Sequence, residues 1–447
     1  MKRRKFTFFA YNPPTSGKFT INGYDYQSDE DYRSVTRCRE YKNCGFDLMQ
    51  LRYEHAYNGE EWETSNANYM WNMAYAAGIK KILITDLRID FLIRPKRGIV
   101  SDVCEKYSEK ELDKLLSSYV APYKDKKGFY GIQLLDEPAY EDLPAYGAVA
   151  RSLQRILPKA YLQMNLHPLG TVKINGLDAK ASYEIYVREA LERTGLDHVS
   201  FDEYPFRREY IISGNTIRNY QVVARVCKER GAEMQAVLQS FANTSQGKYL
   251  KRKVTESDMY WQTNLAMGFG AREFAFYTYM PKWRIDFLNG GDGIDGACFV
   301  NNDGSKTALY GYTKRIIKEM KKFSSVALEY EYENNYLVFG KGKRASDFDQ
   351  TVFAENNGDC PFPIVIDGCV ALVTEQKNGD NRLFMIENIG NIKDEICGSK
   401  AMAVEFSLPS GEHVFWKRGE KIICEKKNGK YVCALKVGEA IFVEVKK

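Results

Sequence analysis

Residues Gly131–Pro138 read GIQLLDEP, an apolar run that ends in two adjacent carboxylates and a proline. The run is typical of a buried strand, and a proline does not continue such a strand in the middle of a sheet. A buried strand has no reason to carry Asp136 and Glu137 to its end unless solvent or a ligand meets them there. We interpret this stretch as a strand that delivers an active-site carboxylate.

The same kind of strand recurs along the chain up to about residue 328, in alternation with stretches of helical period. This pattern is typical of repeated βα units around a parallel sheet. The expected strands are residues 6–11, 46–53, 81–88, 129–137, 161–167, 198–204, 233–241 and 273–279. The expected helices are residues 32–44, 66–77, 109–123, 146–157, 183–194, 216–230, 256–268 and 308–324. Eight alternating pairs predict an α/β fold, a (β/α)8 TIM barrel over residues 1–328.

Glycines mark several of the expected helix ends. Gly45, Gly78, Gly195 and Gly231 each follow a predicted helix, where a left-handed C-terminal cap favours glycine.

From about residue 329 the helical period disappears and short alternating strands follow. A turn such as Lys427-Asn428-Gly429-Lys430 is typical of a hairpin. The expected strands are residues 336–339, 351–354, 363–366, 382–386, 401–406, 414–416, 421–425, 431–435 and 440–445. Residues 329–447 are therefore predicted to form a small antiparallel β-sandwich that packs against the barrel.

Composition excludes several classes of function. The net charge of +5 comes from interleaved basic and acidic residues, which argues against a nucleic-acid partner. The sequence has no apolar run of 18 residues, the length needed to span a membrane. The apolar stretch after the basic start, residues 1–5, is too short for a secretory leader, so we expect a cytoplasmic protein. The ten cysteines show no C-x-x-C pair, so we expect reduced thiols and neither a zinc site nor a disulfide framework. No cofactor motif is present, so no cofactor is expected. The composition is compatible with a homo-oligomer.

Strand alternation predicts which side chains reach the mouth of the barrel, where the carboxyl ends of the strands carry the chemistry. It turns Glu137 of the fourth strand and Asp202 of the sixth strand inward. A one-residue register error would exchange Asp202 for Glu203, which is therefore a reserve candidate. The side chains expected to bind substrate around them are Arg52, Asp136, Asn165, His167, Tyr204, Gln239, Tyr279 (or Tyr277 on the same strand) and Trp283.

Two carboxylates that flank one bond are the requirement for glycoside hydrolysis. One is protonated and releases the leaving oxygen, and the other attacks the anomeric carbon or activates water. We predict Glu137 as the general acid and Asp202 as its partner across the barrel. A separation of ~5 to 5.5 Å would give retention of configuration and ~6.5 to 9.5 Å inversion.

Several short motifs resemble barrel glycoside hydrolases related to clan A, including the family 42 β-galactosidase-like group. They are LDEP (135–138), SFDEYPF (200–206), REFAFYTY (272–279), FVNNDGSKTALYGYTKRIIKEM (299–320) and GKYVCALKVGEAIFVEV (429–445). The resemblance implies that Glu137 is the fourth-strand acid/base, with Asp136 where asparagine is usual. It also implies a nucleophilic glutamate at the end of the seventh strand, but that position is Gln239, which cannot attack as a carboxylate.

Two further hypotheses remain open. Asp136 and Glu137 resemble pairs that orient an acetamido group and protonate the leaving group, which would make the chain a substrate-assisted N-acetylhexosaminidase. The missing seventh-strand glutamate also permits a barrel that binds carbohydrate without cleaving it. Trp62 and Trp283, in predicted loops, are candidate sugar-stacking platforms.

Overall fold

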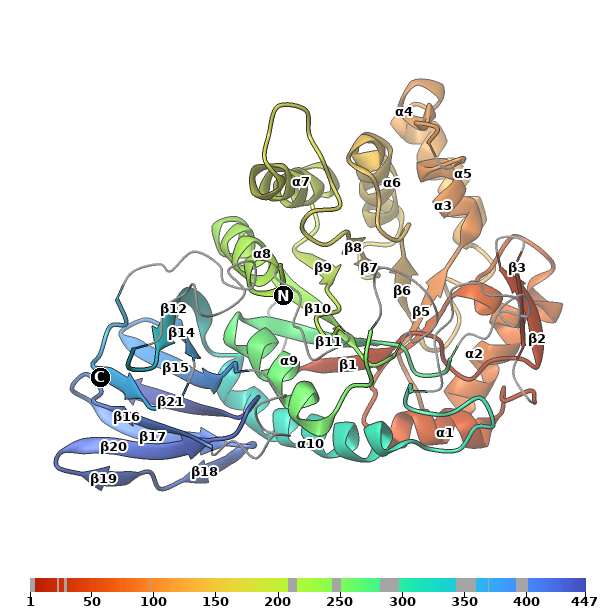
Figure 1. Cartoon of the computed structure of the whole chain (residues 1–447). Helices are drawn as coiled ribbons and strands as arrows, with labels where there is room; N and C mark the ends of the chain where they lie inside the picture. The colour runs from red at the N-terminus through yellow and green to blue at the C-terminus, as the bar shows by residue number, and fades with distance from the viewer. Residues whose placement is uncertain are drawn as a thin grey trace.

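The computed structural model describes residues 5–21, 24–27, 30–96, 98–207, 215–242, 251–281, 297–342, 359–368, 370–390 and 401–447. An α/β part comes first along the chain, and antiparallel strands follow it (Figure 1).

Parallel strands form the centre of the α/β part, and each of the eight predicted strands is confirmed. One sheet has the order β4-β5-β6-β7 and the other β1-β11-β10-β9-β8, with every pair parallel. Only Met164 separates β7 from β8, so the fifth predicted strand contributes to both sheets. The strands are β1 (Thr7–Ala10), β4 (Met49–Leu51), β5 (Ile82–Thr85), β6 (Phe129–Gln133), β7 (Tyr161–Gln163), β8 (Asn165–Leu166), β9 (His198–Asp202), β10 (Glu233–Gln239) and β11 (Ala271–Tyr277).

The two parallel sheets share a buried core. Their side chains meet there in one buried cluster that includes Phe9, Leu48, Leu83, Val237 and Ala275. At the edge opposite β7 and β8, the backbone N–H of Asp47 donates to the carbonyl of Phe8 at 2.7 Å, which links the chain entering β4 to β1. The carboxyl ends of all these strands therefore face the same side of the molecule.

The eight predicted helices are also present, on the outside of the strands (Figure 1). They are α1 (Val35–Asn43), α2 (Asn66–Ala76), α5 (Glu109–Val120), α6 (Leu143–Ile156), α7 (Ala179–Thr194), α8 (Thr216–Arg230), α9 (Glu256–Gly268) and α10 (Ala308–Ala327). The four predicted capping glycines have positive φ angles, between 65° and 118°. Short elements that the sequence pattern did not predict are β2 (Lys18–Ile21), β3 (Tyr24–Gln27), α3 (Leu87–Ile93), α4 (Val103–Lys106) and the 3-10 turns η1 (Tyr53–His55), η2 (Trp62–Thr64) and η3 (Tyr140–Asp142).

The C-terminal strands form two antiparallel sheets with the orders β12-β14-β15-β21-β17-β18 and β13-β16-β20-β19. Apolar side chains between them form a second core. The strands are β12 (Glu331–Phe339), β13 (Ile364–Ile366), β14 (Val370–Asn378), β15 (Asn381–Asn388), β16 (Met402–Phe406), β17 (Glu412–Lys417), β18 (Glu420–Ile422), β19 (Glu425–Lys427), β20 (Lys430–Leu435) and β21 (Ala440–Lys446). The prediction missed β14 and wrongly joined β18 and β19, which belong to different sheets. The expected strand 351–354 lies outside the described residues.

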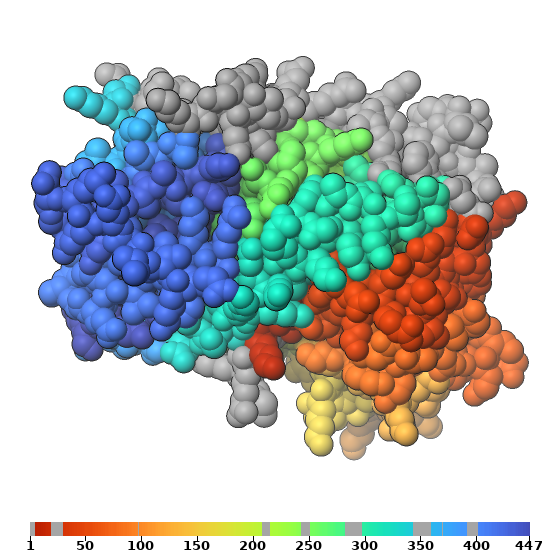
Figure 2. Space-filling model, turned by 90° about the horizontal axis from the view of Figure 1, so that it is seen from below, coloured from red at the N-terminus to blue at the C-terminus, as the bar shows by residue number. Residues whose placement is uncertain are grey.

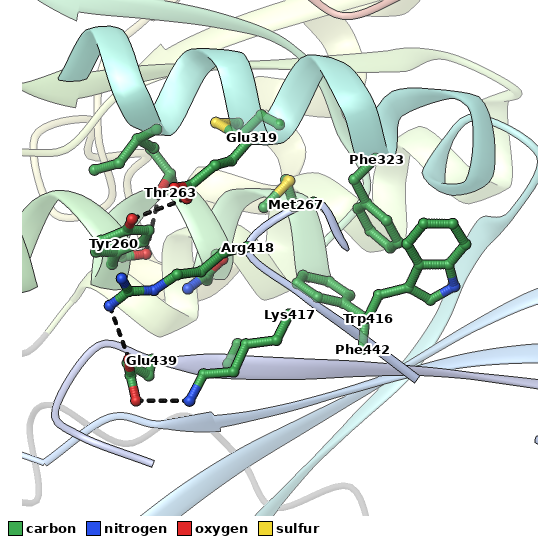
Figure 3. Close-up of a pocket in the computed structure, with 15 residues that line it drawn as sticks. Tyr260, Thr263, Met267, Glu319, Phe323, Trp416, Lys417, Arg418, Glu439 and Phe442 are labelled. Atoms are coloured by element: carbon green, nitrogen blue, oxygen red, sulfur yellow. Dashed lines mark hydrogen bonds and ion pairs between the residues drawn. The ribbon is translucent and has the colours of Figure 1, made fainter. Parts of the chain in front are cut away.

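The α/β part and the C-terminal sheets pack directly against each other, as predicted. The side-chain amide of Gln376 in β14 donates to the carbonyls of Met267 and Gly268 at 2.7 and 3.0 Å, and Asn264 of α9 donates to the carbonyl of Gly438 at 2.9 Å. Figure 2 shows α10 between the C-terminal sheets and the first helices. Figure 3 shows the junction at closer range, where Trp416 packs on Phe323 of α10.

Candidate active site

Glu137 lies four residues beyond the end of β6, in an unusual backbone conformation. Its φ angle is +48°, in the left-handed region that side chains other than glycine adopt at a cost of about 1 to 2 kcal/mol. Two hydrogen bonds hold this bend: the N–H of Glu137 donates to the carbonyl of Asn165 at 3.0 Å, and the carbonyl of Glu137 accepts from Arg94 at 3.0 Å. The turn, and not strand alternation alone, sets the direction of this carboxyl group.

Asp202 is the last residue of β9, and its side chain meets Glu137. It is 7% exposed, and its carboxyl group lies within reach of a hydrogen bond with that of Glu137. Such a bond needs a proton on one of them. Burial raises the pKa of Asp202 well above its usual range, and the negative charges of Glu137 and Asp136 raise it further. The surroundings therefore favour the proton on Asp202 in the free protein.

Asp136 is held as a carboxylate beside this pair. Its Oδ2 accepts from Arg52 at 2.9 Å and its Oδ1 accepts from the amide of Asn165 at 3.0 Å. Burial would raise the pKa of Asp136, but the charge and hydrogen bond of Arg52 and the hydrogen bond of Asn165 hold it below its ordinary value. The same Asn165 nitrogen lies 3.4 Å from Asp202, and the Ser200 hydroxyl donates to Oδ1 of the Asn165 side chain at 2.6 Å, so this side-chain amide has a fixed orientation.

A histidine and an aromatic wall complete the site. Nδ1 of His167 lies 3.4 Å from Oε1 of Glu137, and the Glu137 side chain is 36% exposed, which leaves it the more accessible of the two paired carboxyls. The ring of Tyr277 lies 5.7 Å from that of Tyr204 and 5.9 Å from that of Tyr11. Tyr204 and Tyr277 pack against the inner cluster. Burial raises the pKa of Tyr204, and the nearby negative charges of Asp202 and Glu137 raise it further, so this ring lies close to the pair.

Four of the predicted site residues lie elsewhere in the structure: Glu203, Gln239, Tyr279 and Trp62. The carboxylate of Glu203 accepts from Asn219 of α8 at 2.9 Å, which directs it toward the helix layer. Gln239 is fully buried, and its amide is hydrogen-bonded to the backbone of Phe206 and Phe241, so it joins loops and does not face a substrate.

Tyr279 was expected inside on the basis of alternation, but β11 ends at Tyr277 and the alternation ends with it. Tyr279 packs against Tyr41, Phe46 and Phe299 in the core. Trp62 is likewise a core residue, in contact with Trp71, so it is not a stacking platform. Trp283 lies outside the described residues.

Three polar residues near the site were not predicted. The ring of Tyr11 follows β1 on its inner face, and the alternation Phe9, Tyr11 contains the signal that could have found it. Asp90 of α3 has a carboxyl oxygen with no hydrogen-bond partner, and burial raises its pKa to about 8. Lys251, whose pKa burial lowers to about 8, donates to the carbonyl of Tyr204. Neither has a signal in the sequence, because Asp90 lies on a short helix that the pattern did not predict and Lys251 lies outside the strands and helices.

Across the described residues, no group of His, Cys, Asp and Glu side chains has the arrangement of a metal site. The helices described here include none that is long and apolar enough to cross a membrane.

No family model and no curated protein matches the sequence. Solved structures do. A family 5 glycoside hydrolase from Bacteroides vulgatus aligns over 99% of this chain and 89% of its own, with 13% identity and a TM-score of 0.50. The α-amylase of Geobacillus thermoleovorans complexed with acarbose and an Anoxybacillus α-amylase each align over 99% of this chain and 98% of their own, with 10% identity and TM-scores of 0.52 and 0.51. At these identities the similarity shows the fold alone, which this chain shares with glycoside hydrolases.

Proposed function

We propose that this chain is a glycoside hydrolase in which Glu137 and Asp202 form the catalytic pair. The observation that carries the proposal is the close approach of the two carboxyl groups beyond the carboxyl ends of β6 and β9, which lie on either side of the β7–β8 strand. A pair that holds one proton has the composition that glycoside cleavage needs, one acid and one carboxylate. The fold shared with glycoside hydrolases supports the same function, and carbohydrate is the proposed substrate.

The different depths of the two residues assign their roles. Asp202 is nearly buried and suits a nucleophile that faces the sugar ring from below, whereas the more exposed Glu137 suits an acid beside the departing group. The reactive form has the shared proton on Glu137, reached by transfer across the hydrogen bond. Glu137 then protonates the glycosidic oxygen as its bond to the anomeric carbon breaks, and Asp202 bonds to that carbon. Water, deprotonated by Glu137, afterwards displaces Asp202.

The closeness of the pair favours a retaining mechanism. Carboxyl groups in hydrogen-bonding contact are nearer to the separation of ~5 to 5.5 Å in retaining enzymes than to the ~6.5 to 9.5 Å that leaves room for a water in inverting ones. A sugar that enters between Glu137 and Asp202 separates them.

Asp136 and its partners serve to position the pair. The carboxylate of Asp136 is bonded to Arg52 on one oxygen and Asn165 on the other. A residue already engaged in this way is poorly suited to orient an acetamido group, so the geometry favours the two-carboxylate mechanism over the substrate-assisted one. Asn165 contacts both Asp136 and Asp202, and it holds the negative charge of Asp136 close to the pair.

The proposal is tested with three single substitutions and a panel of aryl glycosides that includes N-acetyl sugars and their plain hexose counterparts. Glu137→Gln and Asp202→Asn should each lower kcat/KM by about a hundredfold to ten-thousandfold on the best substrate of the wild type, because each removes a group that transfers a proton or attacks. Glu203→Gln is the matched control, since its carboxylate contacts α8. It should keep kcat/KM within about threefold of the wild type.

Each other outcome has a defined meaning. Full activity in either the Glu137 or the Asp202 variant rejects the pair. Cleavage confined to N-acetyl sugars would favour the substrate-assisted mechanism. Sugar binding measured by calorimetry, together with unchanged oligosaccharides after long incubation, would favour a barrel that only binds carbohydrate.

The finer assignments of fold and location belong to the proposal as well. We propose that the two parallel sheets close as one (β/α)8 barrel over residues 1–328, with the β-sandwich domain over residues 329–447. The end of α10 at Ala327 and the start of β12 at Glu331 support that boundary. The family 42 β-galactosidase-like resemblance and a cytoplasmic location remain predictions of the sequence.

A further inference from the structure

Two cysteines face each other across the β19–β20 hairpin of the C-terminal domain. The antiparallel register pairs Lys427 with Lys430, Lys426 with Tyr431 and Glu425 with Val432. One step further along the same register, Cys424 lies opposite Cys433. Both are free thiols, and both side chains pack against the core between the two C-terminal sheets, so they point to the same face.

The distance between these positions suits a disulfide. Directly opposed residues of antiparallel strands have Cα atoms ~4.5 or ~5.5 Å apart, depending on the type of pair. A disulfide needs Cα atoms ~4.4 to 6.8 Å apart, so both types fall within the range. The Cys424 thiol donates to the carbonyl of Val432, the residue next to Cys433, at 3.5 Å, so its sulfur lies beside the Cys433 position.

The pair is also accessible. Cys424 and Cys433 are both partly exposed, whereas Cys38, Cys44, Cys227 and Cys298 are buried. The residue next to Cys424 in the chain, Ile423, is 98% exposed, so this segment lies on the molecular surface. A small disulfide can therefore reach Cys424 without unfolding of the domain.

We propose that Cys424 and Cys433 are a redox modification site that closes to a cross-strand disulfide by exchange with a low-molecular-weight disulfide. The Cys424 thiolate attacks the small disulfide, forms a mixed disulfide and releases one thiolate. Cys433 loses its proton and attacks the Cys424 sulfur, which expels the second thiolate. Two protein thiols are oxidised and one small disulfide is reduced to two thiols, so atoms and electrons balance.

The order of attack follows from the environments of the two sulfurs. The hydrogen bond from Cys433 lowers the pKa of the Cys424 thiol, while the same contact and burial raise the pKa of the Cys433 thiol. Cys424 also lies beside the exposed Ile423 at the start of the edge strand, whereas Cys433 lies within β20 between β16 and β19, so Cys424 is the attacking thiol and Cys433 the resolving one. The product ties the edge strand β19 to β20 and is reversed by a dithiol reductant.

The test uses the full-length chain, oxidised glutathione and tryptic mapping. Trypsin releases residues 422–426 and 431–436, each with a single cysteine. In the wild type, these two peptides should be recovered linked, lighter by two hydrogens than their sum. Prior oxidation should lower alkylation of Cys424 by iodoacetamide at least tenfold, and dithiothreitol should restore it. Cys433→Ser should instead retain a glutathione adduct on Cys424.

Three results would overturn the proposal. They are two free thiols after long exposure to oxidised glutathione, a persistent glutathione adduct on Cys424 in the wild type, and linkage between different molecules when isotopically heavy and light chains are mixed. Cys104→Ser, which removes an exposed cysteine elsewhere, is the control and should leave the linked peptides unchanged. Its circular dichroism and that of Cys433→Ser, compared with the wild type, distinguish a folding defect from a loss of exchange.

Discussion

Substitution of Asp136 by Asn should shift the pH dependence of the reaction in a direction that the structure defines. The amide nitrogen of Asn165 lies 3.0 Å from Asp136 and 3.4 Å from Asp202, so the two carboxylate oxygens are at most about 6 Å apart. At that distance and an effective dielectric constant of ~20, two unit charges repel by about 3 kcal/mol, which corresponds to about two pH units. Because solvent at the rim screens part of this repulsion, we expect one to two pH units.

The direction of the pH shift follows from the effect of the Asp136 charge on the pair. The Asp136 carboxylate raises the pKa of Asp202, and with it the pH at which the pair loses its shared proton. In Asp136→Asn that proton is lost at lower pH, so the basic limb of the kcat/KM profile should move toward acid by about one to two pH units. The assay is the rate of aryl glycoside cleavage between pH 4 and pH 10.

The control is Asp113→Asn, which removes a carboxylate on α5 that is paired with Arg155, and should leave the profile unchanged. A basic limb of Asp136→Asn that stays in place, or moves toward alkali, would refute the electrostatic coupling of Asp136 to the pair.

Two further predictions concern stability and are measured by urea denaturation. Glu387 of β15 is fully buried, neither of its carboxyl oxygens has a hydrogen-bond partner, and burial raises its pKa. The wild type therefore loses stability as the pH rises above the unfolded-state pKa of about 4.3. Glu387→Met should raise the free energy of unfolding by about 1 to 3 kcal/mol at pH 7 and by less at pH 4. An equal gain at both pH values would contradict this. Gly438→Ala should lower the free energy of unfolding by about 2 kcal/mol or more, because the φ angle of Gly438 is +78° and a Cβ would collide with the carbonyl oxygen of Ser257 in α9. Gly429→Ala has a similar φ of +82° with open space around it and should lose only about 1 kcal/mol; equal losses would show that the contact with α9 is unimportant.

Periodicity predicted most of the fold because it reports burial. The runs around Ile132 and Ala236 are buried on the helix side of the sheets, as their alternation required. The same alternation predicted Asp202 on the inside and Glu203 on the helix side. The hydrogen bond between Glu203 and Asn219 of α8 agrees with this prediction. It missed β14 (Val370–Asn378), because the first five residues of this strand are all buried and therefore form a continuous run without the alternation of a half-exposed strand.

Strand alternation stops being informative where strands end. Tyr279 lies two residues beyond β11 and turns into the core, and Glu137 is directed by a left-handed turn and by Arg94. The role of Gln239 depends on the backbone of a loop that follows a different strand. Such contacts join residues far apart in the sequence, and no local pattern encodes them.

The most direct test of the central claim is chemical rescue with azide. In Asp202→Ala, azide should occupy the place of the missing nucleophile and yield a glycosyl azide of the opposite anomeric configuration to the substrate. In Glu137→Ala, with an aryl glycoside whose leaving group needs little protonation, azide should attack the glycosyl–Asp202 intermediate and yield a glycosyl azide of the same configuration. These two products would establish a retaining glycosidase with Asp202 as nucleophile and Glu137 as acid/base. The absence of glycosyl azide from both variants, or the exchange of the two configurations, would contradict the account.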